Sequence, residues 1–353
     1  MAEKAVERKG GHRWGLHRVL DKEPRLPQSA LHLDNSLPIY SNEILIDVDC
    51  LNIDAASFVQ MEKETGGDAG QIGRIVQGNS REIGKQQNKV TGSGGMLIGR
   101  VLVVGSRYKG PCRFKVGDSV ATLVSLTLTP LLIEQIRSVD LKSHQIRVKG
   151  HAILFETGIA AKLPSDLPER VVMAAFDVAG APATVYALCR KGQSVLVVGA
   201  GGKAGILSCV AARQKVGRTG RVYAVEPFEA AASDLRKLKV CDAVWQIDAT
   251  NPVEVAARVA EVTRDKMVDV VTNVASVPNT ELSSILSCRS RGKVLLFSMA
   301  TSFTRAALGA EGIASEATLL FGNGYYPGHD AFVLKQLRRF PDLQSLFLSR
   351  YGR

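Results

Sequence analysis

A glycine-rich turn between a short apolar run and a helix-like segment constrains the fold of this chain more than any other stretch. Residues 194–198 are Ser-Val-Leu-Val-Val, which is typical of a buried parallel strand, and residues 206–212 have the apolar spacing of a helix. Strand, glycine turn and helix in this order predict a dinucleotide site, because backbone N–H groups and the positive end of the helix face the pyrophosphate. The predicted cofactor contacts are Gly199, Gly201, Gly202, Lys203, Ala204 and Gly205.

A carboxylate follows this turn at the spacing expected for ribose recognition. The strand-like run 221–225 ends at Glu226, about 20 residues beyond the glycines. A carboxylate there binds both ribose hydroxyls and repels a 2′-phosphate, so the predicted cofactor is NAD. NADP stays open, because Lys203 and Arg221 could soften that preference. The glycine spacing also departs from the common G-x-G-x-x-G, and Glu226 has the alternative of being a solvated strand-end carboxylate.

The C-terminal half alternates strand-like runs with helical segments. The runs are 194–198, 221–225, 243–247, 268–273, 293–298 and 317–322. This alternation predicts an α/β domain over residues 167–353, with the doubly wound parallel sheet of a Rossmann fold. Ligands bind at the carboxyl ends of such strands, so Asn273 and Ser298 are predicted to contact the nicotinamide end of the cofactor. Residues 334–348 are expected to form the last helix.

The N-terminal half has a different pattern of short strands and turns. Residues 43–51 alternate apolar and polar side chains, and residues 115–120 form a tight turn into another short strand. The pattern predicts a mainly β catalytic domain over residues 1–166. Residues 58–89 are polar with glycines near the middle and predict one or two helices, whose role the sequence leaves open.

Composition narrows the partners and the compartment. The formal net charge is +11, but the lysines and arginines are scattered, so we expect a basic surface and no nucleic-acid partner. Six dispersed cysteines without a C-x-x-C pair indicate a reducing cytoplasm. No apolar stretch reaches membrane-span length, and the N-terminus is charged, so neither a membrane partner nor secretion is expected.

The order of the two domains resembles the medium-chain dehydrogenase/reductase superfamily. The resemblance rests on Glu-Ile-Leu-Ile at 43–46, on Val-Gly-Asp-Ser-Val at 116–120 and on the Rossmann segment, and it implies a GroES-like fold for the first domain. Zinc-dependent members hold the metal with a Cys near the first turn, a Gly-His-Glu and a later Cys. The last two of these stretches correspond to residues 91–96 and 176–178, which contain neither His nor Cys. We therefore expect no metal.

A closer resemblance is to the L-erythro-3,5-diaminohexanoate dehydrogenase family of lysine fermentation. The segments that carry it are 15–19, 26–28, 42–54, 91–99, 176–182 and 197–205. It implies NAD(P)-dependent oxidative deamination of a small amino-acid substrate at C3, giving 5-amino-3-oxohexanoate and ammonia. Superfamily precedent implies a homodimer or a larger homo-oligomer. Two alternatives stay open: a zinc-free quinone or enoyl-thioester reductase, and a nucleotide-binding module recruited to RNA or to a structural role.

Deamination requires a general base, because an ammonium cannot release hydride from its carbon before it loses a proton. The superfamily places catalytic groups at two turns, which makes Asp54 and Asp177 the candidates. Either could instead anchor the C5 ammonium, cap a helix or stabilise a turn.

The remaining candidates concern the substrate. Arg81, Lys85 or Arg18 could pair with its carboxylate, although a solvated surface charge is the more ordinary interpretation of each. His17 belongs to the resembling N-terminal stretch and is a predicted substrate contact. Thr91 and Ser93 are predicted to line the substrate site, or to serve only as turn residues.

Overall fold

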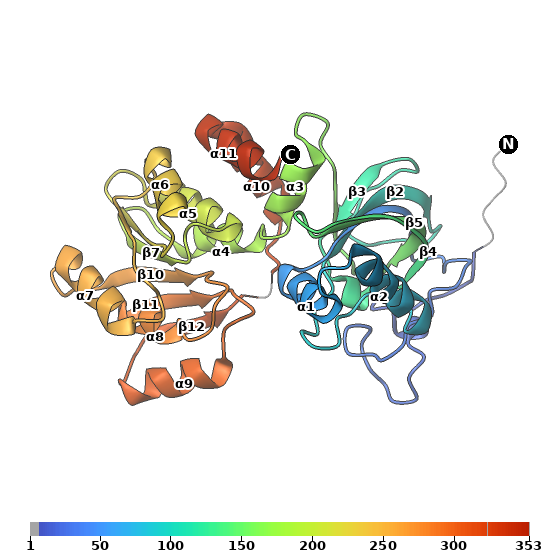
Figure 1. Cartoon of the computed structure of the whole chain (residues 1–353), viewed down its shortest axis with the longest axis horizontal. Helices are drawn as coiled ribbons and strands as arrows, with labels where there is room; N and C mark the ends of the chain where they lie inside the picture. The colour runs from blue at the N-terminus through green and yellow to red at the C-terminus, as the bar shows by residue number, and fades with distance from the viewer. Residues whose placement is uncertain (1–6, 323, 353) are drawn as a thin grey trace. The chain divides into compact units, whose positions relative to one another are not determined.

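Two sheets, one in each half of the sequence, organise the chain (Figure 1). The computed structural model describes residues 7–322 and 324–352. The chain divides into two compact units, residues 1–169 and residues 170–353. Each unit has its own sheet and its own apolar core.

The first unit is built on an antiparallel sheet with strand order β4-β5-β1-β2-β3-β6. Its strands are β1 (Ile44–Asn52), β2 (Met96–Val104), β3 (Ser119–Thr122), β4 (Leu131–Asp140), β5 (Gln145–Leu154) and β6 (Ala160–Lys162). It also contains helices α1 (Ala55–Thr65) and α2 (Ala69–Glu82) and short 3₁₀ turns at Leu16–Arg18 and Leu126–Leu128. The strand β1 is central and pairs with both β2 and β5.

The alternation in the sequence explains the position of β1. Ile44, Ile46 and Val48 point into the core, while Asp47 and Asp49 are exposed. This is the two-residue period of a strand with one buried face. The prediction of a mainly β first half is confirmed. The helical prediction for residues 58–89 corresponds to α1, which begins three residues earlier at Ala55, and to α2.

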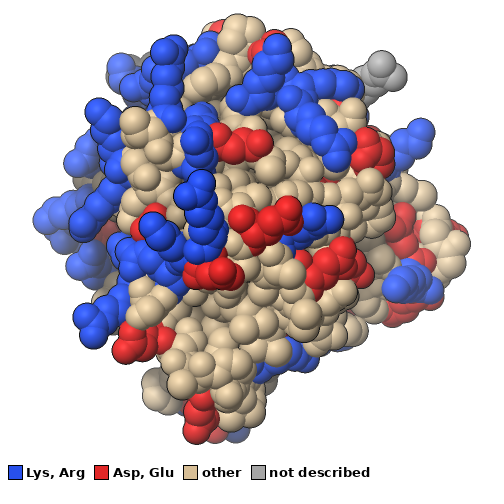
Figure 2. Space-filling view, turned by 90° about the vertical axis from the view of Figure 1, so that its left-hand side faces the viewer, with Lys and Arg blue, Asp and Glu red and all other residues tan. Residues whose placement is uncertain are grey.

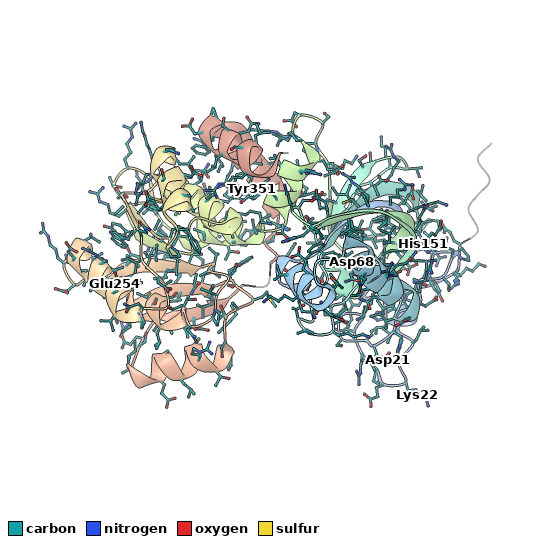
Figure 3. All side chains as sticks on the ribbon, in the orientation of Figure 1. Asp21, Lys22, Asp68, His151, Glu254 and Tyr351 are labelled. Atoms are coloured by element: carbon teal, nitrogen blue, oxygen red, sulfur yellow. The ribbon has the colours of Figure 1, made fainter. Side chains whose placement is uncertain are left out.

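The helix α2 has an identifiable start. The Asp68 side chain, labelled in Figure 3, accepts a hydrogen bond of 2.9 Å from the backbone N–H of Gln71 and so caps the helix. One face of α2 then packs on β4: a Cβ atom on Gly73 would lie 3.2 Å from Ile136. Glycine at this position therefore lets the helix approach the sheet closely.

The second unit is built on a parallel sheet with strand order β12-β11-β10-β7-β8-β9. Its strands are β7 (Ser194–Val198), β8 (Arg221–Val225), β9 (Ala243–Trp245), β10 (Val268–Asn273), β11 (Cys288–Leu296) and β12 (Thr318–Phe321). Its helices are α3 (Glu169–Phe176, beginning at the boundary), α4 (Gly180–Leu188), α5 (Lys203–Val216), α6 (Glu229–Leu238), α7 (Pro252–Thr263), α8 (Glu281–Leu286), α9 (Phe303–Gly312), α10 (His329–Arg339) and α11 (Pro341–Tyr351). Figure 1 shows α5 and α6 on one face of this sheet and α7, α8 and α9 on the other.

The doubly wound α/β prediction is confirmed by this topology. The predicted strands at 194–198, 221–225 and 268–273 have the observed bounds. The expectation of a single last helix over 334–348 is wrong, because the chain forms two helices, α10 and α11. Phe340 is extended between them, and Pro341 follows at the first position of α11, where its missing N–H costs no helical hydrogen bond.

Surface charge is mixed in sign. Figure 2 shows one face of the molecule, where Lys and Arg side chains crowd one side and Asp and Glu lie among them. Within residues 7–322 and 324–352, no single helix has the length and apolar composition to cross a membrane. The pair α3 and α4 meets that criterion only jointly, across a bend of 51°.

Candidate functional site

The glycine turn follows β7 and is fixed by close backbone contacts. Gly199 has φ of +75°, in the left-handed region, and a Cβ atom there would lie 2.5 Å from Cα of Ala275. Gly205 lies in the first turn of α5, where a Cβ atom would lie 2.4 Å from the carbonyl oxygen of Gly199. Both glycines are therefore required by the turn itself.

Gly202 differs from the other glycines of the turn because it faces open space. It is the N-cap of α5, and no atom beyond its chain neighbours lies within 4 Å of the position that a Cβ atom would take. The first N–H groups of a helix have no partner inside the helix, and the N-terminus carries partial positive charge. A helix N-terminus with open space at its N-cap fits a pyrophosphate. Lys203 and the half-buried Ala204 begin the helix at this point.

Glu226 lies directly against this turn. Its Oε2 accepts a hydrogen bond of 2.8 Å from the N–H of Gly201, and its Oε1 accepts one of 3.2 Å from the N–H of Phe228. A Cβ atom on Gly201 would lie 2.6 Å from the carboxylate carbon of Glu226. The acid and the glycines predicted from their spacing thus meet at the carboxyl ends of the adjacent strands β7 and β8.

Asp177 and Lys203 form an ion pair. The Lys203 ammonium donates a hydrogen bond of 2.6 Å to Oδ2 of Asp177, which lies in the break between α3 and α4. Both side chains are about 30% exposed. The sequence assigned the carboxylate to catalysis and the lysine to the cofactor, whereas the structure joins them at the start of α5.

Asn273 does not fulfil its predicted role. Its side chain is completely buried, its Nδ2 donates to the carbonyl oxygen and hydroxyl of Thr280 and to the hydroxyl of Ser284, and its Oδ1 accepts from the N–H of Ala275. A side chain enclosed in this way shapes the loop beside Gly199 and is not available to a cofactor. Ser298 lies beyond β11, and its hydroxyl accepts a hydrogen bond of 3.1 Å from the N–H of Ala300.

Arg350 of the last helix contacts the glycine turn, although nothing in the sequence predicts it. Its Nη1 donates a hydrogen bond of 2.7 Å to the carbonyl oxygen of Gly201, and its Nη2 lies 2.6 Å from Oδ2 of Asp234. The guanidinium therefore ties α11 and α6 to the glycine turn. No local sequence pattern indicates this contact, because Arg350 and Gly201 lie 149 residues apart.

In the first unit, the predicted polar residues gather where β1 ends and α1 begins. Oδ1 of the half-buried Asp54 accepts a hydrogen bond of 3.4 Å from the N–H of Ser57. The hydroxyl of Ser57 lies 2.5 Å from that of Thr91, and Oγ1 of Thr91 accepts from the N–H of Ser93 at 3.3 Å. The structure therefore brings Asp54, Thr91 and Ser93 into one cluster.

Backbone contacts hold the loop of Thr91 against this turn. Gly95 has φ of +100°, and a Cβ atom there would lie 2.1 Å from the carbonyl oxygen of Asn52. The Asn88 side chain accepts hydrogen bonds from the N–H groups of Val90 and Thr91, at 2.8 and 2.9 Å, and donates one of 2.6 Å to Gln60. Asn88 thus links this loop to α1 through its side-chain hydrogen bonds. Asn88 is not among the residues that the sequence predicts for the site.

His17 and Arg18 lie elsewhere in the first unit, in a structural network around Glu43. Nδ1 of His17 accepts from the N–H of His12 at 2.8 Å, so its Nε2 donates to Glu43 at 2.8 Å. The completely buried Arg18 binds both oxygens of Glu43 and the carbonyl oxygen of Ser36. Burial acts to raise the pKa of Glu43, but the hydrogen bonds from His17 and Arg18 hold it below its usual value. The suggested pairing of Arg18 with a substrate is therefore wrong, and both ring nitrogens of His17 are already used.

Lys85 and Arg81 also bind backbone carbonyl groups. Nζ of the buried Lys85 donates to the carbonyl oxygens of Pro27 and Gln28, at 3.1 and 3.3 Å, and burial lowers its pKa to about 8. Lys85 is consequently not available to a substrate. Arg81 is exposed in the last turn of α2 and donates to the carbonyl oxygen of Glu134, so its assignment to the substrate stays a prediction.

Potential metal ligands are dispersed. In the part of the chain that the structure describes, no three His, Cys, Asp or Glu side chains converge in a way that could hold a metal ion.

Comparisons with known proteins give one consistent family. Residues 17–164 match the model of the L-erythro-3,5-diaminohexanoate dehydrogenase N-terminal domain. The chain is 46% identical to the L-erythro-3,5-diaminohexanoate dehydrogenase of Acetoanaerobium sticklandii over 97% of its own length and 99% of that protein. It is 45% identical to the enzyme of the same name from Fusobacterium nucleatum, with the same shares covered.

Solved structures share the fold at low identity. An alcohol dehydrogenase from Thermotoga maritima has a TM-score of 0.55 at 14% identity, covering 88% of this chain and 85% of that one. The enoyl reductase CurK has a TM-score of 0.53 at 14% identity, covering 84% of this chain and 79% of that one. A mycobacterial protein complexed with NADPH has a TM-score of 0.53 at 19% identity, covering 89% of this chain and 84% of that one. This likeness supports the fold alone.

Proposed function

The chain belongs to the L-erythro-3,5-diaminohexanoate dehydrogenase family and is an oxidoreductase, and from this membership we propose that it oxidises L-erythro-3,5-diaminohexanoate at C3 with NAD(P), giving 5-amino-3-oxohexanoate and ammonia. The observation that carries the proposal is similarity to two curated dehydrogenases over almost the whole of each chain. The proposed context is lysine fermentation in the cytoplasm.

The residues of the glycine turn fit a nicotinamide dinucleotide. Gly202 and the N-terminus of α5 would hold its pyrophosphate, and Glu226 would bind the adenosine ribose. A carboxylate against the turn disfavours a 2′-phosphate, so NAD is the proposed cofactor, with NADP weaker. When bound, the nicotinamide supplies the acceptor for the hydride.

Asp54 is the proposed general base. The substrate ammonium at C3 first gives a proton to this carboxylate, and the carbon then releases hydride, leaving a substrate iminium. Water adds to the iminium carbon and loses a proton, and ammonia leaves as the C3 carbonyl forms. We assign this role to Asp54 because the predicted substrate contacts Thr91 and Ser93 lie in the same cluster, and we assign Asp177, which is paired with Lys203 at 2.6 Å, to the cofactor. The hydroxyls of Thr91 and Ser93 are proposed to position the substrate beside Asp54.

The Asp177–Lys203 pair is proposed to support the cofactor. Lys203 is the first residue of α5 and lies next to the open face of Gly202. Its ammonium adds positive charge where a pyrophosphate would bind, and Asp177 fixes the direction of its side chain. Asp54 is therefore proposed to accept the substrate proton, and Asp177 to orient Lys203 toward the cofactor.

The test is reduction of NAD or NADP by purified protein with L-erythro-3,5-diaminohexanoate, followed by absorbance together with an assay of released ammonia. Equal amounts of reduced cofactor and ammonia are the expected result. Cofactor binding without turnover would show that L-erythro-3,5-diaminohexanoate is not the substrate, while the proposed dinucleotide site would still be supported. Quinones and enoyl thioesters would then be tested, since enoyl reductases have a similar fold.

A further inference from the structure

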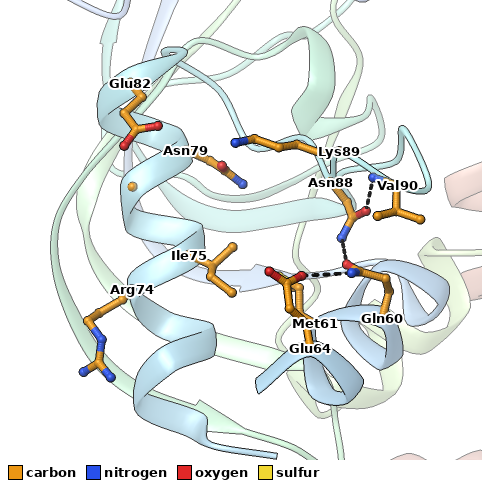
Figure 4. A pocket seen from close by; sticks show the side chains of 11 residues that line it. Gln60, Met61, Glu64, Arg74, Ile75, Asn79, Glu82, Asn88, Lys89 and Val90 are labelled. Carbon is orange, nitrogen blue, oxygen red and sulfur yellow. Dashed lines mark hydrogen bonds between the residues drawn. The ribbon is translucent and has the colours of Figure 1, made fainter. Parts of the chain in front are cut away.

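A pocket of about 370 Å³ lies in the first unit, between α1, α2 and the turn at residues 88–90 (Figure 4). Its volume is at the small end of the range for metabolite sites. The residues that line it do not include Asp54, Ser57, Thr91 or Ser93. The pocket is therefore distinct from the cluster proposed for catalysis.

The floor of the pocket is apolar. Met61 of α1 is buried, and Ile75 of α2 is half-buried beside it. Gly78 leaves a gap in this floor: the position of a Cβ atom there has only Glu82 nearby, at 4.0 Å. A surface of this kind suits an aliphatic chain.

Charged groups surround this floor. Glu64 of α1 and Glu82 of α2 line the pocket together with Lys89. Figure 4 shows the Lys89 ammonium and the Glu82 carboxylate directed toward one another at one end, and the Glu64 carboxylate over Met61 near the middle. Arg74 also lines the pocket, but Figure 4 shows its guanidinium pointing away. Two carboxylates and one ammonium thus face the space.

We propose that this pocket binds a small diamino carboxylic acid at a site separate from the reacting centre. Glu64 and Glu82 would each accept an ammonium, Lys89 would bind the carboxylate, and the aliphatic chain would lie on Met61 and Ile75. Charge-assisted hydrogen bonds are stronger than neutral ones, so a ligand with all three charges is preferred over one that lacks an ammonium. This inference goes beyond the proposed reaction and does not depend on it.

Asn88 links the pocket to the catalytic cluster. Asn88 lines the pocket. Its Nδ2 donates a hydrogen bond of 2.6 Å to Gln60, which also lines the pocket, and one of 3.4 Å to the carbonyl oxygen of Ser57. Its Oδ1 accepts from Val90 and Thr91, so one side chain holds both the rim of the pocket and the loop of the substrate hydroxyls. Gln60 in turn donates a hydrogen bond of 2.9 Å to Glu64. A ligand held by Glu64 and Lys89 is therefore expected to stabilise this loop, as an effector would.

The probe is L-lysine, titrated into the full chain by calorimetry without cofactor. L-lysine has one carboxylate and two ammonium groups but no amine at C3, so it is not a substrate of the proposed reaction. We expect a Kd below about 1 mM. L-norleucine, which lacks the terminal ammonium, is expected to bind about tenfold more weakly, or 1.4 kcal/mol. Hydrogen exchange at residues 88–93 is expected to slow when L-lysine is bound.

Pocket variants locate the site. Two variants are expected to weaken L-lysine binding by about tenfold or more: the double variant Glu64→Gln with Glu82→Gln, and the single variant Lys89→Met. Gly78→Leu fills the gap in the floor and improves helix propensity, so it blocks binding without unfolding α2. Glu62→Gln and Lys63→Met are matched controls on α1 outside the pocket lining, and Asp54→Asn tests the catalytic cluster.

The outcomes are decisive in either direction. Weakening confined to the pocket variants supports the site. The proposal is overturned by the absence of L-lysine binding, by equal weakening in the α1 controls, or by loss of binding in Asp54→Asn alone. Equal affinity for L-norleucine would overturn the diamino class.

Discussion

Nζ of Lys203 lies 2.6 Å from Oδ2 of Asp177, so an ammonium at the first residue of α5 is held by a carboxylate in the break between α3 and α4. Asp54, the other carboxylate expected to act as a base, instead accepts a backbone N–H of Ser57 at 3.4 Å. The contact with Lys203 occupies one oxygen of Asp177 and joins that carboxylate to the start of α5. The two aspartates are therefore expected to respond differently to the same substitution.

Asp54→Asn removes the proposed proton acceptor with almost no change in shape. We expect kcat to fall about a hundredfold or more, because general-base catalysis contributes factors of that size. The KM for the cofactor is expected to change little, since Asp54 is not part of the glycine turn. Steady-state kinetics with varied cofactor and varied substrate measure both quantities.

The matched control is Asp49→Asn, which changes an exposed aspartate on β1, the strand that precedes Asp54. It is expected to keep wild-type kcat. Full activity in Asp54→Asn would remove this residue from catalysis.

Asp177→Asn and Lys203→Met are expected to weaken cofactor binding without slowing the proton transfer from the substrate. Each should raise the KM for the cofactor about three- to tenfold with kcat nearly unchanged, because each releases the same ion pair. The two substitutions combined should cost less than the sum of the two alone, as contacting residues do in a double-mutant cycle. A large fall in kcat for Asp177→Asn alone would instead identify Asp177 as the base.

Glu226→Ala is expected to raise the KM for NAD about tenfold, or 1.4 kcal/mol, and to relax discrimination against NADP. The carboxylate holds the N–H groups of Gly201 and Phe228, so the variant also loosens the turn. Kinetics with both cofactors test the prediction, and Glu229→Ala on the exposed start of α6 is the control. Unchanged kinetics with both cofactors would place the ribose elsewhere.

Arg350→Ala is expected to detach α11 from the glycine turn. The guanidinium joins Asp234 to the carbonyl oxygen of Gly201, and losing such charged hydrogen bonds costs about 1.5 kcal/mol or more. We expect a lower midpoint of urea unfolding together with a higher KM for the cofactor. Asp234→Asn should share both effects in weaker form. A stability loss without any change in KM would limit Arg350 to packing.

Much of the second unit could be predicted because its signals are local. Strands buried on both faces of a parallel sheet are continuous apolar runs, and β7, β8 and β10 have the bounds that those runs predict. The break between α10 and α11 was missed because the apolar spacing continues across Phe340 and Pro341. A proline at the first helical position is compatible with a new helix, and the spacing alone does not distinguish it from a continued one.

The site was only partly predictable, for a different physical reason. Gly199 and Gly202 are found by their spacing, because turn geometry links residues that are close in sequence. Glu226 is found because it directly follows the next predicted strand. Arg18, Lys85 and Asn273 have the residue types of binding groups, yet all three are buried and hydrogen-bonded within the protein. Arg18 and Lys85 pair with backbone groups 18 and 58 residues away. Burial of a polar side chain depends on tertiary partners, which local periodicity does not encode.

Lys85 provides a test of such a buried charge through the pH dependence of stability. Burial lowers its pKa to about 8 in the folded chain, against 10.5 for an ordinary lysine. Between these values the unfolded chain binds more protons than the folded one, so the contribution of Lys85 to the free energy of unfolding rises with pH. The slope is at most about 1.4 kcal/mol per pH unit, the value for one proton.

Lys85→Met should abolish this contribution, so the difference in unfolding free energy between wild type and variant should change steadily from about pH 8 to 10.5. Urea unfolding at several pH values measures that difference, in which the titration of all other groups cancels. Lys63→Met, at an exposed position of α1, controls for the loss of an ammonium. Parallel pH profiles for wild type and Lys85→Met would show that Lys85 stays protonated throughout this range, and that its contacts with the carbonyl oxygens of Pro27 and Gln28 offset its burial.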